Sequence, residues 1–249
     1  MSSTANGDGI TVVLVHGAFA DASSWNGVIP RLQAKGLSVT APPNPLRGIE
    51  ADSAYIASVL QQIEGPILVV GHSYGGAVIT NAATDVKNVV GLVYVAAFAP
   101  EEGEALGAVA ADSKDSVLNS ALVPRKYPDG DGGAKMEFSI DPAKVREAFA
   151  SDLSDQDVAL IGVTQRPISE LAFTQPSGPP AWKDRPSWAV VATGDRAVGT
   201  DTSRSMAERA GATITEVEGS HVIMVSQPQA VAEVILEAVG AVASVHVGV

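Results

Sequence analysis

Short apolar runs alternate with helix-like segments along this chain, and the alternation limits its fold more than any other feature. The run at 10–15, ITVVLV, is apolar throughout and rich in β-branched residues, which is typical of a strand buried on both faces. Further strands are expected at 37–43, 66–71, 88–99, 187–194 and 212–219. Helices are expected at 23–36, 49–63, 75–84 and 201–211, with a last one from Ser226, where Gln229 has capping-box spacing. Because repeated strand–helix units make crossover connections, we expect an α/β protein with a mostly parallel central sheet of about six strands flanked by helices.

The alternation is interrupted between residues 101 and 185. This stretch carries helix-like pieces, such as 141–153, separated by loops rich in glycine and proline, and it contains no convincing buried strand. We therefore expect a core formed by residues 1–100 and 186–249. Residues 101–185 are expected to form a helical cap, or lid, packed on the sheet.

The composition excludes several classes of partner and cofactor. The chain has 28 acidic and 16 basic residues, a formal net charge of −12, and no cysteine. An acidic surface does not attract nucleic acids or anionic membranes, so we expect neither as a partner. The four histidines do not cluster at metal-ligand spacing, and the glycines do not form a dinucleotide fingerprint. We therefore expect no metal and no organic cofactor.

No segment has the character of a membrane span or an export signal. None of the apolar runs reaches the roughly 20 residues needed to cross a bilayer. The first nine residues also lack a basic segment followed by an apolar one. We expect a cytoplasmic protein. The sequence leaves its oligomeric state open, and a homodimer is one of the alternatives.

A serine lies between glycines where a predicted strand meets a predicted helix. Residues 71–75 read GHSYG, which fits the pattern G-x-S-x-G. A sharp turn at this place would strain the backbone of Ser73 and expose its hydroxyl at the carboxyl edge of the sheet, while a Cβ at Gly71 or Gly75 would collide with a neighbouring element. The N–H of Tyr74 would then point to where an oxyanion forms. The pattern favours a nucleophile over a packing turn with an incidental serine.

A serine hydroxyl needs a base to take its proton, and four histidines limit the choice. His16 is better suited to holding its own loop through hydrogen bonds. The side chain of His72 is expected to point away from that of its neighbour, Ser73, and His246 lies in the terminal tail. Only His221 follows a predicted strand and precedes the last helix, so it belongs at the sheet edge that carries the serine. We expect His221 to be the base.

The acid that orients the base is expected to be Asp195. It ends the strand expected at 187–194, between the insertion and His221, and it therefore belongs to the same sheet edge. The competing carboxylates are Asp201 as a helix cap, Glu218 in a turn, and Glu101 and Glu102 after the fourth strand.

The second oxyanion donor is expected in the turn after the first strand, HGAF. Gly17 allows the chain to turn sharply there, which would offer the N–H of Ala18, or less favourably that of Phe19, to the point that Tyr74 faces.

The segments LVHGAFADASSW, VVGHSYGGAV, TGDRAV and VEGSHVIMVSQP resemble the α/β-hydrolase superfamily. They are most similar to its branch of plant methyl-salicylate-type esterases, hydroxynitrile lyases and bacterial esterase relatives. The resemblance implies an α/β-hydrolase fold and a triad in the chain order Ser73, Asp195, His221. Fewer than ten residues precede the first strand, so the two amino-terminal strands of the full eight-stranded fold are expected to be absent.

The resemblance also distinguishes between chemistries. Dehalogenases and epoxide hydrolases of this fold carry an aspartate where this chain has Ser73. The hydroxynitrile lyases resemble one another in a threonine after the first strand and a lysine beside the histidine, where this chain has Gly17 and Val222. We therefore expect a serine hydrolase of the carboxylesterase type, which cleaves small or medium carboxylic esters through an acyl-enzyme.

Other functions remain as alternatives at this point. They are lactone, thioester or carbon–carbon bond hydrolysis, acyl transfer and the lyase reaction, all on the same residues. A protein of the same fold that only binds a ligand is a further alternative.

Overall fold

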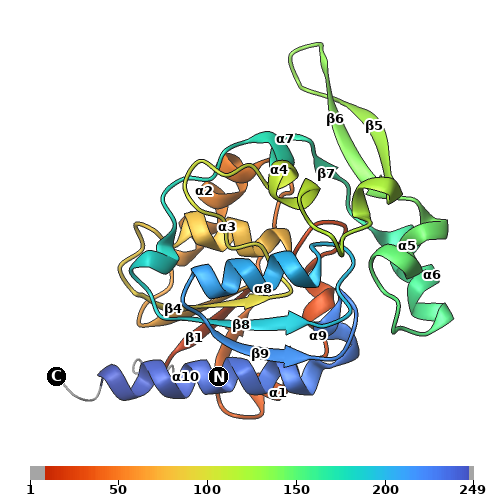
Figure 1. The fold of residues 1–249 in the computed structure, drawn as a ribbon. Helices are drawn as coiled ribbons and strands as arrows, with labels where there is room; N and C mark the ends of the chain where they lie inside the picture. Colours follow the sequence, from red (N-terminus) through yellow and green to blue (C-terminus); the bar gives the residue numbers. More distant parts are fainter. Residues whose placement is uncertain (1–8, 247–249) are drawn as a thin grey trace, which may run out of the picture.

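A six-stranded parallel sheet with helices on both faces forms the centre of the molecule (Figure 1). The computed structural model describes residues 9–246. The strand order is β2–β1–β3–β4–β8–β9, and every neighbouring pair is parallel. The strands are β1 (Thr11–Val15), β2 (Ser38–Thr40), β3 (Ile67–His72), β4 (Val89–Val95), β8 (Ser187–Ala192) and β9 (Thr213–Val217). The predicted fold class, with its mostly parallel sheet, is confirmed.

Successive residues of the inner strands pack into two separate hydrophobic clusters, one on each face of the sheet. Val13 and Val69 pack with α2, α3 and α8, whereas Leu14 and Val70 pack with α1 and α10. These helices are α1 (Ile29–Gln33), α2 (Ile49–Leu60), α3 (Tyr74–Ala82), α8 (Thr200–Arg209) and α10 (Pro228–His246). Because β3 and β8 are buried along their whole length, the apolar runs of the sequence correspond to strands covered on both faces.

Two predicted helix starts are wrong by a few residues. The segment at 23–36 divides into a 3-10 turn, η1 (Ala22–Trp25), capped by Asp21, and α1, which begins only at Ile29. The last helix begins at Pro228 rather than at a cap on Ser226, because Ser226 ends a separate short helix, α9 (Ile223–Ser226). Within residues 9–246, no hydrogen bond joins the side chain of Ser226 to the Gln229 N–H, and the Ser226 N–H donates to the Val222 carbonyl, so the expected capping box does not form.

The segment from 101 to 185 contains strands as well as helices, so the prediction of a helical cap needs correction. Its helices are α4 (Leu106–Ala111), η2 (Leu118–Ala121), η3 (Pro142–Lys144), α5 (Val145–Ala148), α6 (Asp155–Thr164), α7 (Leu171–Thr174) and η4 (Ala181–Lys183). Its strands are β5 (Leu122–Pro128), β6 (Ala134–Ile140) and β7 (Ile168–Ser169), which form an antiparallel sheet. The hairpin of β5 and β6 projects from the body of the molecule (Figure 1). These strands are half exposed and polar, and therefore lack the apolar run that marks a buried strand.

The free edge of this small sheet is formed by β5. Lys126 pairs with Met136, whose carbonyl accepts a hydrogen bond from Glu170 on the β7 side, 3.0 Å away. Lys126 and Met136 are therefore a non-hydrogen-bonded pair, in which the N–H and C=O groups of the two residues point away from each other. The N–H and C=O groups of Lys126 consequently point to the open edge of the sheet. Pro124 and Pro128 lie two residues before and after Lys126, so their backbones face the same open edge. Because proline has no N–H, two positions on this edge lack a donor.

The insertion leaves the sheet after β4 and returns to it as β8, the next strand along. Leu92 of β4 pairs with Ser187, the first residue of β8, so the returning chain has to travel back along the sheet. It does so beside α3, which η4 contacts, and the Trp182 indole N–H donates to the Pro100 carbonyl at 3.1 Å. The last part of the insertion is therefore also the crossover between two parallel strands.

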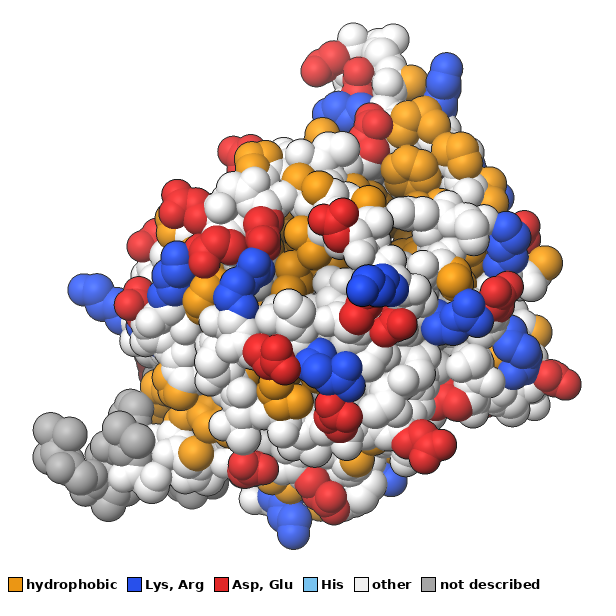
Figure 2. All heavy atoms as spheres, viewed as in Figure 1, with side chains coloured by type: hydrophobic (Ala, Val, Ile, Leu, Met, Phe, Trp, Pro, Cys, Tyr) orange, Lys and Arg blue, Asp and Glu red, His pale blue; other side chains and the backbone are white. Residues whose placement is uncertain are grey.

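On the face shown in Figure 2, acidic and basic side chains are interspersed, without a basic patch. Among the helices of residues 9–246, none is long and apolar enough to span a bilayer.

Candidate active site

Ser73 lies at a strained turn between β3 and α3. Its backbone has φ 53° and ψ −123°, a conformation that non-glycine residues rarely adopt. A Cβ on Gly71 would lie 2.6 Å from the Gly75 carbonyl oxygen, and one on Gly75 would lie 2.5 Å from the carbonyl oxygen of Val15 in β1. Both glycines are therefore required by close packing, as the sequence predicts, and the turn presents Ser73 at the carboxyl edge of the sheet.

The loop after β1 lies directly against this turn. A Cβ on Gly17 would lie 2.7 Å from the Cβ of Ser73. Phe19 has a positive φ of 61°, which turns the loop sharply after Ala18. The backbone N–H groups of Ala18 and Tyr74 donate no hydrogen bond within residues 9–246, so both remain free for a ligand oxygen.

His221 and Asp195 form a buried pair at the same edge. The His221 Nδ1 lies 2.9 Å from Oδ2 of Asp195, and the two residues are each 1% exposed. The other carboxylate oxygen of Asp195 accepts hydrogen bonds from the N–H groups of Ala197 and Val198, at 2.8 and 3.1 Å. These bonds fix the carboxylate, and the carboxylate in turn fixes which nitrogen of His221 carries the proton.

His72 connects the serine turn to this pair. Its ring centroid is 4.7 Å from that of His221, and its Nε2–H donates to the His221 carbonyl at 3.0 Å. Complete burial, together with the nearby His221, holds the pKa of His72 well below its usual value. His72 is therefore a neutral donor that holds the backbone of His221 beside residue 73.

The bond between serine and histidine is not closed in this conformation. The Nε2 of His221 is buried and has no hydrogen-bond partner in the part of the chain that the structure describes. Ser73 is 6% exposed, so the turn is covered as well. Such bonds are often long in a free enzyme and shorten when substrate binds.

The other predicted candidates lie elsewhere. Asp201 accepts hydrogen bonds from Ser113 and the Lys114 N–H, and it lies in the first turn of α8 rather than at its cap, which is Gly199. Glu101 pairs with Lys183. Within residues 9–246, Asp195 is the carboxylate that contacts the His221 ring.

His16 has the structural role that its position predicts. Its Nδ1–H donates to the Gly17 carbonyl at 2.9 Å, while its Nε2 accepts from the Asn44 N–H at 2.9 Å. Burial lowers the pKa of His16, so the ring is neutral. Asn44, whose side chain also donates to the His16 carbonyl at 3.0 Å, is not predicted from the sequence.

Two carboxylates near the site were also missed. Asp52 accepts a hydrogen bond from the Tyr74 hydroxyl at 2.7 Å, and burial raises the pKa of Asp52. Its position could have been found, because Asp52 follows Ile49 and precedes Ile56 at helical spacing on the apolar stripe of α2. Asp152 accepts from the Ser220 N–H at 3.0 Å, and no sequence pattern indicates this contact.

A metal centre is not among the features of this region. Residues 9–246 contain no group of three or more histidine, cysteine, aspartate or glutamate side chains arranged to hold a metal ion. The arrangement supports proton transfer and nucleophilic attack by the residues themselves.

Similar proteins were found at the levels of family, sequence and structure. Methylesterase 2 of Arabidopsis thaliana is 26% identical over 248 residues, covering 90% of this chain and 94% of that enzyme. A carbendazim hydrolyzing esterase of Nocardioides sp. is 34% identical over 110 residues, which cover 39% of this chain and 46% of that enzyme. The crystal structure of polyneuridine aldehyde esterase superposes with a TM-score of 0.79 at 20% identity, covering 93% of this chain and 99% of that one.

The family assignment depends on the match that covers most of the chain. Residues 12–234 match the model of the alpha/beta hydrolase family, a range that includes every strand of the central sheet except the first residue of β1. Methylesterases of plants, the branch indicated by the sequence motifs, are among the similar proteins. This chain belongs to the alpha/beta hydrolase family.

Proposed function

We propose that this protein is a serine hydrolase that cleaves small or medium carboxylic esters through an acyl-enzyme intermediate. The observation that carries the proposal is the buried His221–Asp195 pair beside a strained serine turn. Proteins similar to this chain are named methylesterase, carbendazim hydrolyzing esterase and pyrethroid hydrolase, which supports ester cleavage.

The proposed mechanism assigns one role to each group. The Ser73 hydroxyl attacks the ester carbonyl while His221 Nε2 takes its proton, and Asp195 stabilises the imidazolium that results. The free N–H groups of Ala18 and Tyr74 bind the oxyanion of the tetrahedral intermediate. His221 then gives the proton to the departing alcohol, and a water molecule releases the acid by the reverse sequence.

Replacing the nucleophile tests this proposal. Ser73→Ala is expected to lower kcat for p-nitrophenyl acetate by about 10⁶-fold, because residues that act as a unit lose nearly all their effect together. Circular dichroism checks that the variant is folded, and Ser58→Ala, on the exposed surface of α2, serves as the control with full activity. A folded Ser73→Ala enzyme that still hydrolyses the ester would contradict the proposal.

Covalent labelling provides a second readout. Diethyl p-nitrophenyl phosphate is expected to add one diethylphosphoryl group to the Ser73 peptide, as measured by mass spectrometry, and none to Ser73→Ala. A protein that only binds ligands would not be labelled. The cytoplasmic location expected from the sequence stays a prediction, which cell fractionation would test.

A further inference from the structure

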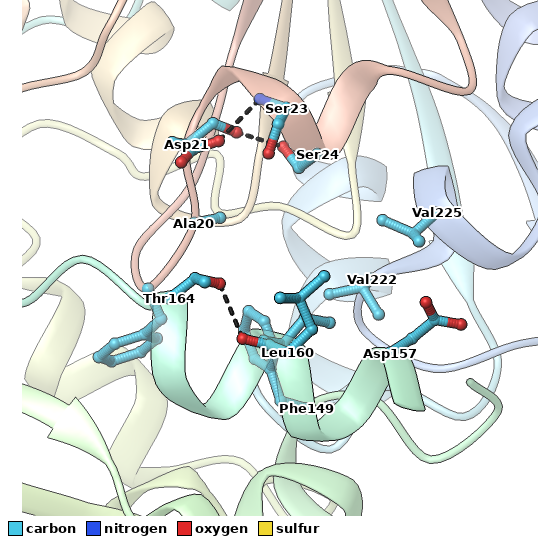
Figure 3. A pocket seen from close by; sticks show the side chains of 12 residues that line it. Ala20, Asp21, Ser23, Ser24, Phe149, Asp157, Leu160, Thr164, Val222 and Val225 are labelled. Carbon is cyan, nitrogen blue, oxygen red and sulfur yellow. Dashed lines mark hydrogen bonds between the residues drawn. The ribbon is translucent and has the colours of Figure 1, made fainter. Parts of the chain in front are cut away.

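A cavity of about 170 Å³ lies between the loop after β1 and helix α6. Figure 3 shows Asp21, Ser23 and Ser24 on one side of it and Leu160 and Thr164 of α6 on the other. Its lining combines side chains from the core with side chains from the insertion. The larger apolar ones are Phe19, Phe149, Leu160, Ile161, Val222 and Val225.

The cavity adjoins both halves of the proposed catalytic site. Phe149 lies with its ring centroid 5.0 Å from that of His221, and 6.0 Å from that of Phe19. Val222 directly follows His221, and Phe19 directly follows Ala18. Since His221 has to protonate the departing oxygen of the ester, the alcohol part lies on the histidine side of the reacting carbon. Ser73 and His221 do not themselves line the cavity, so the alcohol part would reach it past Phe149 and Val222, the lining residues next to the histidine.

Its volume and lining suit one ring. A cavity of roughly 150 Å³ lined by leucine, isoleucine and phenylalanine is large enough to hold benzene. Part of this cavity has a lining of that kind, and the rest is formed by serine, threonine and aspartate side chains. Leu160 is 57% exposed, so the cavity is open to solvent at this residue. An apolar group of about the size of a phenyl ring fits it.

The charges at the cavity are negative. Asp21 and Asp157 line it, and no lysine or arginine is among its lining residues. The hydrogen bond from Ser23 lowers the pKa of Asp21, so this carboxylate is ionised at neutral pH. Arg166 also lowers the pKa of Asp21, but Arg166 is not among the residues that line the cavity. An anionic group would therefore be repelled here.

We propose that this cavity binds the alcohol part of the substrate, and that the preferred alcohol is an apolar, ring-sized group without negative charge. The proposal rests on the function proposed above and narrows it to a substrate class. A methyl ester would leave the cavity empty, whereas a benzyl ester would fill it.

The size of the alcohol is tested by filling the cavity. Leu160→Trp is expected to lower kcat/KM for benzyl acetate by about tenfold or more, since small changes in an apolar pocket have effects of this order. The value for methyl acetate should stay within about twofold. Val163→Trp is the matched control, because Val163 is on the same helix, is 78% exposed and does not line the cavity.

A third ester tests the orientation. Methyl phenylacetate carries its ring on the acyl side, so Leu160→Trp should leave its hydrolysis nearly unchanged. Loss of activity toward methyl phenylacetate with unchanged activity toward benzyl acetate would overturn the assignment to the alcohol part. Equal effects of Leu160→Trp and Val163→Trp on benzyl acetate would overturn the cavity as a binding site.

The charge preference is tested with benzyl acetates that carry a para methyl, trimethylammonium or carboxylate group. The para-carboxylate compound is expected to have the lowest kcat/KM. Asp157→Asn should raise this kcat/KM severalfold relative to that of the para-methyl compound. Asp85→Asn is the control, because it removes one negative charge from an exposed position outside the cavity. A wild-type preference for the carboxylate ester would contradict the proposal.

The cavity proposal can fail without the proposed function failing. If wild type hydrolyses the esters and Ser73→Ala does not, the function stands whatever the Leu160→Trp result. Binding of benzyl alcohol to Ser73→Ala, followed by saturation-transfer NMR, gives a readout without turnover. Adding Leu160→Trp should abolish this binding and adding Val163→Trp should not; binding that persists in both would overturn the cavity proposal alone.

Discussion

His221 is held from several directions by groups that come from different parts of the chain. Asp195 binds one ring nitrogen, the neutral His72 donates to the backbone carbonyl, and the ring of Phe149 packs against the imidazole. Asp152 accepts a hydrogen bond from the preceding N–H, at Ser220. Because Asp152 belongs to the insertion, this contact connects the position of the insertion to that of His221, the proposed base.

Removing the Asp152 carboxylate should therefore impair turnover more than binding. Asp152→Ala leaves the Ser220 N–H without its acceptor and is expected to lower kcat by about tenfold, because small displacements of a catalytic group have large effects. The free energy of unfolding should fall by only about 1 kcal/mol. Steady-state kinetics with benzyl acetate and urea unfolding measure the two effects.

Asp152→Asn is the matched variant, since its amide oxygen still accepts the hydrogen bond. It should restore most of the kcat that Asp152→Ala loses. A rise in KM with kcat unchanged, or no rescue by asparagine, would show that Asp152 does not act by positioning His221.

The residues that the sequence predicts and those that it misses differ in a physical respect. Ser73, Asp195 and His221 each follow a strand closely, and parallel strands place such positions at one edge whatever the details of packing. Asn44 and Asp152 act through contacts with segments far away in the chain. No pattern within one segment specifies those contacts, so they become visible only once the elements are packed.

Among the elements, the central strands were predicted well and the hairpin of β5 and β6 was not. A buried parallel strand needs a nearly continuous apolar run, which the sequence shows for β1, β3, β4 and β8. The hairpin is stabilised by the pairing of β5 with β6, the next strand in the chain. Many of the β5 side chains are at least partly exposed, and two of its residues are prolines. The turn between its strands lies in one of the expected loops rich in glycine and proline, YPDGDGG, where Asp129 accepts hydrogen bonds from two backbone N–H groups.

The prolines of β5 are expected to keep the hairpin from pairing with a second molecule. The double variant Pro124→Val/Pro128→Thr returns two N–H groups to the outer edge of β5. It should self-associate more than wild type, increasingly so at higher protein concentration. Sedimentation velocity over a concentration series measures this change.

Pro179→Thr is the control, because Pro179 is an exposed loop proline away from any sheet edge. It should leave the sedimentation profile unchanged. If the double variant sedimented like wild type at every concentration, the two prolines would not be what prevents pairing through β5.

At the scale of the whole molecule, the insertion is fastened to the core where it leaves the sheet. Glu104 receives two hydrogen bonds from Arg209 at the end of α8, at 2.6 and 2.7 Å. Its carbonyl accepts from the N–H of Ser177, in the returning segment, at 2.8 Å. The outgoing chain, the returning chain and a core helix therefore meet at one place.

This junction should make stability depend on pH in the acid range. Burial would raise the pKa of Glu104, but hydrogen bonds from Arg209 and from the Glu101 N–H outweigh burial and lower it. A carboxylate with a lowered pKa in the folded state stabilises above its usual pKa of about 4.3, and this contribution is lost as the pH falls through the lowered value. Glu104→Gln should therefore cost about 1 kcal/mol at pH 7 and almost nothing at about pH 3.

Urea unfolding of wild type and Glu104→Gln across this pH range measures the difference. Glu102→Gln removes an exposed neighbouring charge that has no ion pair in the described part of the chain, and it should give a curve parallel to that of wild type. If the free energies of unfolding of wild type and Glu104→Gln differed by the same amount at all pH values, the charge of Glu104 would not be the source of the stabilisation.

The return of the chain past α3 limits how this enzyme can be shortened. Strand β8 is reached only through the last part of the insertion, so excising residues 101–185 as a unit would leave two neighbouring parallel strands with no route between them. A trimmed enzyme would need a substitute connection of about a dozen residues or more. Loop 129–133, at the far end of the hairpin, is the place where residues can be deleted, or a reporter inserted, without interrupting that route.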